Sequence, residues 1–162
     1  TSVGSDGLFM ATAHIAHDCA VEDHVVMANG ATLGGHVRVE RGAQLSGLSA
    51  VHQHVRIGTL GFVAGGAMVV QDVPPFCTVQ GDRARLAGLN IVGLRRNGFS
   101  REQIASLRHA FRLLFHGDGD LETRLNTLGA AFDDPQAARL ASFLRGGARG
   151  AITTPRRRLA AA

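Results

Sequence analysis

Apolar residues recur through the first 72 residues at a constant interval of six, and the residues two places before them are never larger than valine. Neither the 3.6-residue period of a helix nor the two-residue alternation of a strand fits this interval. Hexapeptide periods are typical of parallel β-helices. The apolar series is Val3, Phe9, Ile15, Val21, Met27, Leu33, Val39, Leu45, Val51, Ile57, Val63 and Val69.

Three six-residue faces close a triangular coil of 18 residues, and stacked coils pair through their backbones about 4.8 Å apart. Residues 1–75 then form a hexapeptide-repeat domain of four coils, with the large apolar residues filling its interior. Gly4, Gly34 and Gly58 each follow an aliphatic residue, so we expect them in tight turns with positive φ. A sandwich of ordinary short strands is the alternative, but residues 11–17 lack the strict alternation that it requires.

Pro74 and Pro75 end the repeat, because proline supplies no backbone donor for a further coil. Residues 76–99 show no clear period and are expected to form an extended connection. Residues 100–150 are expected to form a small helical domain. Its first helix opens with a capping box at residues 100–103 and stops near Gly117, a second begins after Asp120, and Asp134 caps a third. Residues 151–162 are expected to be a disordered basic tail.

Charge is divided unevenly between the two halves. Residues 1–72 hold three arginines against six acidic residues, a net charge of −3, whereas the remainder holds 14 arginines against seven acidic residues, a net charge of +7. Arginine binds phosphates and carboxylates bidentately, so the second half favours an acidic partner or a phosphorylated ligand. A merely solvated, arginine-rich surface is the alternative.

No apolar run approaches the roughly 20 residues of a membrane span, and no signal peptide is recognisable. We therefore expect a cytoplasmic protein. Cys19 and Cys77 are expected to be packing residues rather than a disulfide.

Histidines gather at the turns of the predicted β-helix. The 18-residue register places Gly35 one coil from His17, which leaves that imidazole accessible, and stacks Asp18, His36 and His54 in a polar ladder. A histidine can take a proton from a hydroxyl near neutral pH, and Asp18 is the carboxylate available to orient it. Merely solvated surface histidines are the alternative. A column of small residues leaves room for a groove along the axis: Ala11, Asn29, Gly47 and Gly65.

Five segments resemble bacterial UDP-N-acetylglucosamine O-acyltransferases, which begin lipid A synthesis. They are residues 13–19 (AHIAHDC), 35–37 (GHV), 50–53 (AVHQ), 71–75 (QDVPP) and 88–100 (GLNIVGLRRNGFS). The resemblance implies a left-handed parallel β-helix followed by a helical domain, and a homotrimer with active sites between subunits. It also implies transfer of an (R)-3-hydroxyacyl group from acyl carrier protein to the 3-hydroxyl of UDP-N-acetylglucosamine. No cofactor, metal, nucleic acid or membrane span is implied.

The resemblance also assigns roles to residues. His17 matches the general base, Asp18 would hold its tautomer, and Gly35 is the candidate for stabilising the oxyanion through its backbone N–H. Gly65 matches the position that limits acyl length, where glycine leaves room for a long chain such as hydroxymyristoyl. The remaining matches are substrate contacts, the last two at the UDP end: His14, His36, His52, Gln53, Asn90 and Arg96.

The chain departs from the family at Val92, where an acidic residue is expected near the uridine, and at Asn97, which replaces a second basic residue. The repeat is already running at Thr1, so we expect the family's first coils to be missing and the chain to be part of a longer protein. Two alternatives stay open. One is an inactive trimeric structural or acyl-carrier-binding remnant, and the other is a zinc-dependent hexapeptide carbonic anhydrase.

Overall fold

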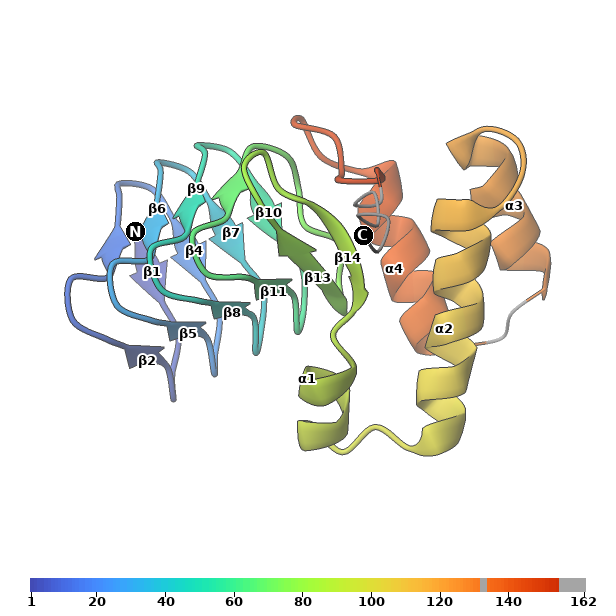
Figure 1. Cartoon of the computed structure of the whole chain (residues 1–162), viewed down its shortest axis with the longest axis horizontal. Helices are drawn as coiled ribbons and strands as arrows, with labels where there is room; N and C mark the ends of the chain where they lie inside the picture. Colours follow the sequence, from blue (N-terminus) through green and yellow to red (C-terminus); the bar gives the residue numbers. More distant parts are fainter. Residues whose placement is uncertain (132–133, 155–162) are drawn as a thin grey trace, which may run out of the picture.

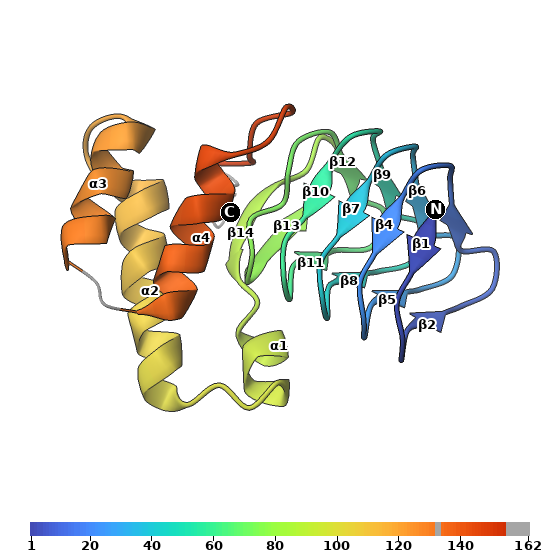
Figure 2. The same cartoon turned by 180° about the vertical axis from the view of Figure 1, so that it is seen from behind.

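The computed structural model describes residues 1–131 and 134–154, and its first half is a parallel β-helix (Figures 1 and 2). Two-residue strands separated by turns lie on three sheets. The first sheet contains β1 (Ser2–Val3), β4 (Ala20–Val21), β7 (Arg38–Val39) and β10 (Arg56–Ile57). The second contains β2 (Leu8–Phe9), β5 (Val26–Met27), β8 (Gln44–Leu45) and β11 (Phe62–Val63). The third contains β3 (His14–Ile15), β6 (Thr32–Leu33), β9 (Ala50–Val51) and β12 (Met68–Val69).

Strand pairing confirms the 18-residue register. Ala20 pairs in parallel with both Ser2 and Arg38, and Arg38 pairs in turn with Arg56. Each coil therefore places a residue directly beside the one 18 positions away. The parallel β-helix predicted from the six-residue period is confirmed, as is the left-handed class that the resemblance implied.

The six-residue apolar series forms the interior of the β-helix. From Val21 to Val69 every member of the series is at most 4% exposed. Burial of one such aliphatic side chain contributes about 1.5–3 kcal/mol. In the first coil, Val3 and Phe9 remain 49% and 38% exposed. The apolar stacking is therefore complete from the second coil onwards.

The turns correct one expectation. Gly4, Gly34 and Gly58 are not the residues with positive φ. They lack side chains because neighbouring backbone lies too close: a Cβ on Gly34 would lie 2.8 Å from the Gln53 nitrogen, and one on Gly58 would lie 2.5 Å from the Pro75 nitrogen.

Positive φ falls instead at every sixth residue, two places further along each turn. Asp18, His36 and His54 have φ of 58°, 60° and 64°. Aspartate and histidine are among the non-glycine residues that accept this conformation most readily. The three residues of the predicted polar ladder therefore all adopt the left-handed conformation at one corner.

The register changes after the last regular coil. β13 (Cys77–Gln80) pairs in parallel with β11, but Phe62 pairs with Thr78, a step of 16 residues rather than 18. β14 (Arg85–Leu89) returns antiparallel to β13, and α1 (Ile91–Arg96) follows. Residues 76–99, expected as an extended connection, thus form a hairpin and a short helix.

Three helices cover the end of the β-helix that lies farthest from β1 and β2 (Figure 1). They are α2 (Arg101–His116), α3 (Leu121–Ala131) and α4 (Pro135–Arg145). The predicted capping box is present, with Ser100 and Gln103 bonded reciprocally, and Asp134 caps α4. Within the described part of the chain, no helix has the length and apolar character needed to cross a membrane.

Arg56 on β10 joins the β-helix to α4 and is itself held by an ion pair within the β-helix. Arg56 Nε donates to Asp72 Oδ2 over 2.8 Å, and its Nη2 donates to the carbonyl oxygens of Phe143 and Gly146 over 2.9 and 2.6 Å. Asp72 is fully buried. A buried carboxylate needs such a partner, because an unpaired charge there is strongly destabilising.

The chain beyond α4 returns to the β-helix. Ala151 bridges Asp72 in parallel, and Ile152 is buried with its N–H donating to the Asp72 carbonyl over 2.8 Å. The first four residues of the expected disordered tail, 151–154, are therefore ordered. The rest of that tail, residues 155–162, lies outside the described residues.

Candidate active site

One corner of the β-helix, between the third and first sheets, carries most of the predicted site. The His17 carbonyl accepts from the N–H of His36 over 3.0 Å, and the Gly35 carbonyl accepts from the N–H of His54 over 3.0 Å. These bonds lock successive turns one coil apart. The side chains at this corner are therefore held on the most regular part of the scaffold.

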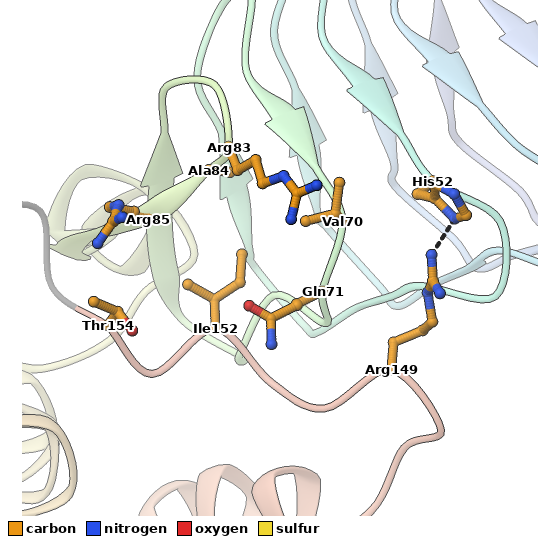
Figure 3. A pocket seen from close by; sticks show the side chains of 9 residues that line it. All are labelled: His52, Val70, Gln71, Arg83, Ala84, Arg85, Arg149, Ile152 and Thr154. Carbon is orange, nitrogen blue, oxygen red and sulfur yellow. Dashed lines mark hydrogen bonds between the residues drawn. The ribbon is translucent and has the colours of Figure 1, made fainter.

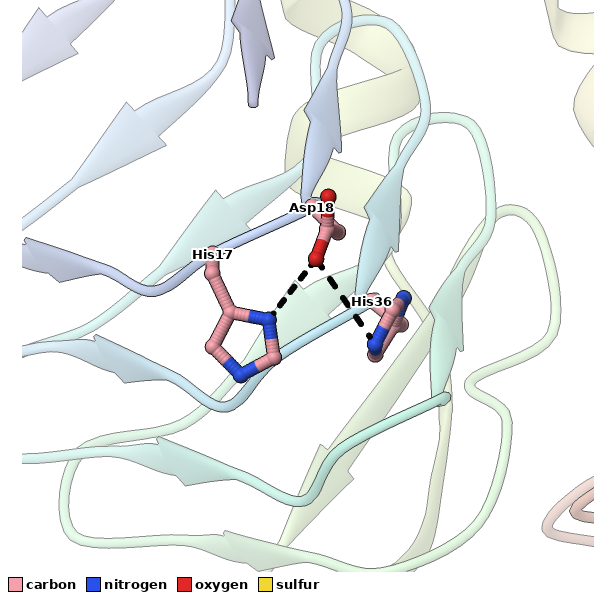
Figure 4. Close-up of side chains that lie close together, drawn as sticks. All are labelled: His17, Asp18 and His36. Carbon is pink, nitrogen blue, oxygen red and sulfur yellow. Dashed lines mark hydrogen bonds and ion pairs between the residues drawn. The ribbon is translucent and has the colours of Figure 1, made fainter.

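His17 and Asp18 form a hydrogen-bonded pair (Figure 4). His17 Nδ1 lies 2.9 Å from Asp18 Oδ2, and the two side chains are 71% and 63% exposed. The hydrogen bond from His17 lowers the pKa of Asp18, and the nearby His36 lowers it further. Asp18 is thus ionised at neutral pH and accepts, so Nδ1 of His17 carries the proton and Nε2 is left as a proton acceptor.

Gly35 lies against the His17 ring, as the register predicted. A Cβ at this position would lie 2.6 Å from His17 Cε1 and 2.7 Å from Nε2. Only glycine leaves the ring where it is. The N–H of Gly35 makes no hydrogen bond within the described residues, so it can donate to an oxygen bound beside His17.

The polar ladder continues along the corner, as predicted. His36 Nε2 lies 3.8 Å from Asp18 Oδ2, and the His36 and His54 rings stack with centroids 4.6 Å apart. The His17 and His36 rings meet edge to face, with centroids 5.1 Å apart. Asp72 lies 18 residues beyond His54 but does not extend the ladder, because it pairs with Arg56.

Three of these groups lie close enough to share a cation. The ligand atoms of His17, Asp18 and His36 all lie within 4.8 Å of one another. Histidine nitrogen and carboxylate oxygen are ordinary zinc ligands, and a catalytic zinc takes three protein ligands. The donor set therefore fits a divalent metal, although the pairing of His17 with Asp18 also fits a metal-free general base.

The other predicted contacts on this side are exposed. His14 belongs to β3, and His52 follows β9 directly. Gln53 is one coil beyond Gly35 at the same corner. His52 Nδ1 accepts a hydrogen bond from Arg149, a residue that sequence reasoning missed. A guanidinium only donates, so this bond excludes donation from His52 Nδ1 to the Gln53 carbonyl.

Asn90 and Arg96 lie elsewhere, on the segment that carries α1. The Asn90 side chain caps α1 by accepting from the N–H of Gly93 over 2.9 Å, and it donates to the Leu60 carbonyl over 2.9 Å. Asn90, Val92 and Arg96 line a cavity of about 420 Å³ beside the second sheet. Within one chain these residues thus form a group separate from His17.

Gly65 lies at a third place, a different corner of the β-helix, and it is exposed. The nearest atom to a Cβ built there is the Gly47 carbonyl oxygen, at 3.5 Å. Open space therefore surrounds the position that was expected to admit a long acyl chain.

A family model and several named proteins match this chain. Residues 72–152 match the sequence model of domain 2 of the UDP-N-acetylglucosamine O-acyltransferases. An acyl-[acyl-carrier-protein]–UDP-N-acetylglucosamine O-acyltransferase of Gloeothece citriformis is 41% identical over 144 residues, which is 89% of this chain and 52% of the relative. That of Aliivibrio fischeri is 48% identical over 122 residues, 75% of this chain and 47% of the relative.

Solved structures show the same relationship. The Arabidopsis UDP-N-acetylglucosamine acyltransferase superposes with a TM-score of 0.90 at 38% identity, covering 94% of this chain and 56% of that one. The Campylobacter jejuni enzyme superposes with a TM-score of 0.91 at 35% identity, covering 96% and 61%. This chain spans about half to three fifths of the length of these relatives. The chain belongs to the UDP-N-acetylglucosamine O-acyltransferase family.

Proposed function

We propose that the protein transfers an (R)-3-hydroxyacyl group from acyl carrier protein to the 3-hydroxyl of UDP-N-acetylglucosamine, the first step of lipid A biosynthesis. The observation that carries this proposal is the His17–Asp18 pair lying against Gly35. It supplies a base of defined tautomer and, beside it, a free backbone N–H. Acyl transfer to an alcohol needs both groups.

His17 and the Gly35 N–H are sufficient to account for the proton transfers and the oxyanion of this reaction. His17 Nε2 takes the proton of the sugar hydroxyl as its oxygen attacks the thioester carbonyl carbon. The carbonyl oxygen becomes an oxyanion, to which the Gly35 N–H donates. The attack has by then formed the C–O bond. Collapse of the tetrahedral intermediate restores the carbonyl and breaks the C–S bond, and the departing thiolate takes the proton from the His17 imidazolium. No cofactor and no covalent enzyme intermediate are required.

The separation of the two residue groups supports a homotrimer with active sites between subunits. His17 of one copy would act with Asn90 and Arg96 of a neighbour, where the arginine suits a diphosphate. His14, His36, His52 and Gln53 would contact the sugar nucleotide from the first copy, and Gly65 would admit a long acyl chain.

Mixing two inactive variants tests this arrangement. His17→Ala trimers and Arg96→Ala trimers each lack one half of every site, so mixed trimers should regain sites with both halves intact. Recovery of acyl transfer after subunit exchange supports a shared site. No recovery, with exchange verified by native mass spectrometry, contradicts it.

The charge of the C-terminal half supports the proposed acyl donor, and the cysteines support the proposed compartment. The basic C-terminal half, with exposed arginines on α2, suits the acidic surface of an acyl carrier protein. Cys19 and Cys77 are buried free thiols, which fits a reducing, cytoplasmic setting.

The deciding assay incubates the protein with UDP-N-acetylglucosamine and (R)-3-hydroxyacyl carrier protein and identifies the product by mass spectrometry. A 3-O-acylated sugar nucleotide supports the proposal. Failure to form any product while acyl carrier protein still binds would favour a non-catalytic remnant. The cluster of His17, Asp18 and His36 keeps a zinc enzyme as the second candidate, which stoichiometric zinc together with CO₂ hydration would support.

A further inference from the structure

A basic cavity lies between the end of the third sheet and the returning C-terminal chain (Figure 3). Its volume is about 590 Å³, and the polar groups on its walls include His52, Gln71, Arg83, Arg85 and Arg149. None of the described residues that line it is acidic. We propose that this cavity binds a phosphorylated anion, with the three arginines as its donors.

The arginines of this cavity have guanidinium N–H groups without an acceptor in the described residues. Within the described residues, the guanidinium groups of Arg83 and Arg85 make no hydrogen bond or ion pair. Arg149 Nη2 donates to His52 Nδ1, but its Nε is buried and has no partner. A buried N–H without an acceptor is unfavourable, and an anionic oxygen in the cavity would supply that acceptor.

Two other arginines beside the β-helix are already partnered. Arg56 is held by Asp72 and two carbonyl oxygens, and Arg139 Nη2 lies 3.1 Å from Glu40. Arg38 and Arg96, outside this cavity, make no side-chain hydrogen bond or ion pair within the described residues. The three cavity arginines differ from these because they line one cavity together and one of them has a buried Nε without a partner.

The walls of the cavity are fixed by the fold. Ile152 and Thr154 form one wall, where the Ile152 N–H donates to the Asp72 carbonyl over 2.8 Å and the Leu86 N–H donates to the Thr154 carbonyl over 3.1 Å. Binding therefore does not first have to order the chain, which lowers its entropic cost.

A phosphate suits the cavity better than a carboxylate. Its oxygens can accept from several guanidinium groups at once, and Arg83, Arg85 and Arg149 all line this cavity (Figure 3). The volume exceeds that of a single phosphate, so a diphosphate or a phosphate carried on a larger group is the better fit. The bound diphosphate would be either part of a nucleotide or free pyrophosphate.

The site would communicate with His52. Because Nδ1 of His52 accepts from Arg149, Nε2 carries the proton and faces away from that bond. An anion that engages Arg149 changes the electric field at this imidazole. His52 is one of the predicted substrate contacts, whereas the three arginines are not. The proposal therefore rests on the proposed function at His52 and adds three arginines to that side of the site.

Titration with inorganic pyrophosphate at low ionic strength tests the proposal, with calorimetry reporting affinity and NMR reporting the His52 imidazole. We expect saturable binding and a shift of the His52 signals. Arg83→Gln/Arg85→Gln should weaken binding roughly tenfold or more. The matched control is Arg108→Gln/Arg112→Gln on α2, which removes the same charge outside the cavity and should leave affinity within about twofold of the wild type.

Equal losses in the two double variants, or binding that leaves the His52 signals unmoved, would overturn the assignment. The wild-type NMR titration decides the matter even if a variant fails to fold. Competition with UDP identifies the source: displacement of pyrophosphate assigns the site to the nucleotide, and simultaneous binding assigns it to free pyrophosphate. None of these readouts requires acyl transfer, so they stand apart from a failure of the proposed function.

Discussion

Replacing Gly35 by alanine tests the geometry of the proposed base. The new Cβ would lie 2.6 Å from His17 Cε1, whereas ordinary contacts begin at 3.4 Å, so the ring must move by about 0.8 Å. Gly35 does not have a positive φ, so alanine adds no backbone strain. The ring is exposed and can swing into solvent at little cost in stability.

Activity should respond far more strongly than stability. Moving the base by most of an ångström shifts Nε2 away from the sugar hydroxyl and disturbs the bond to Asp18. Displacements of about 1 Å cost roughly 10²-fold in rate, which is about 2.7 kcal/mol in the barrier. The free energy of unfolding should change by less than about 1 kcal/mol.

Gly129 on α3 provides the control, because it is exposed and lies outside the proposed site. No heavy atom of the described residues lies within 4 Å of a Cβ built there. Initial rates of acyl transfer and urea denaturation should be measured for both alanine variants. If Gly35→Ala keeps its rate within twofold of Gly129→Ala, the reasoning that places the base beside Gly35 is refuted.

Three further predictions follow from burial and charge. Asp72→Ala removes the partner of Arg56 and should destabilise the protein by about 3–5 kcal/mol in urea denaturation; a loss below 1 kcal/mol would show that the pair does not hold the helices in place. The pKa of Asp18 is lowered by His17, so NMR should find this carboxyl titrating below its ordinary range, and His17→Ala should raise its pKa; the small stabilisation is present above the unfolded-state pKa and is lost as pH falls through the folded-state value. Burial raises the pKa of the Cys77 thiol, so alkylation at pH 8 should proceed only as fast as the protein opens, and rapid modification of the native protein would contradict this.

The six-residue period was enough to predict the contacts between neighbouring coils. A strict 18-residue register makes neighbours computable, so the contact of Gly35 with His17 and the ladder of Asp18, His36 and His54 were both correct. The starts of α2, α3 and α4 were also predictable, because caps are local signals, whereas α1 was not expected. Each of these features depends on residues close in sequence or separated by one coil.

The features that escaped prediction depend on broken register or on distant chain. Asp72 pairs with Arg56 rather than following His54 along the corner, because the step between paired residues falls from 18 to 16 after the last coil. Arg149 reaches His52 because residues 150–154 pair with the β-helix, and no sequence motif in this segment predicts that pairing. The positive-φ positions were misplaced because glycine at Gly34 and Gly58 serves close packing between coils.

The place of Asn90 and Arg96 relative to His17 was not predictable from one chain. Motif resemblance groups these residues by function, but the fold puts them on different faces of the same chain. Only an assembly can bring the two groups together, and the subunit-mixing experiment tests for such an assembly directly.

The most direct test of the account is the rate of hydroxyacyl transfer to UDP-N-acetylglucosamine by the wild-type protein and by His17→Ala. Loss of a general base typically costs 10²–10⁴-fold. The account predicts a loss of this size for a variant whose thermal unfolding matches the wild type. A His17→Ala protein that forms product at the wild-type rate would contradict it.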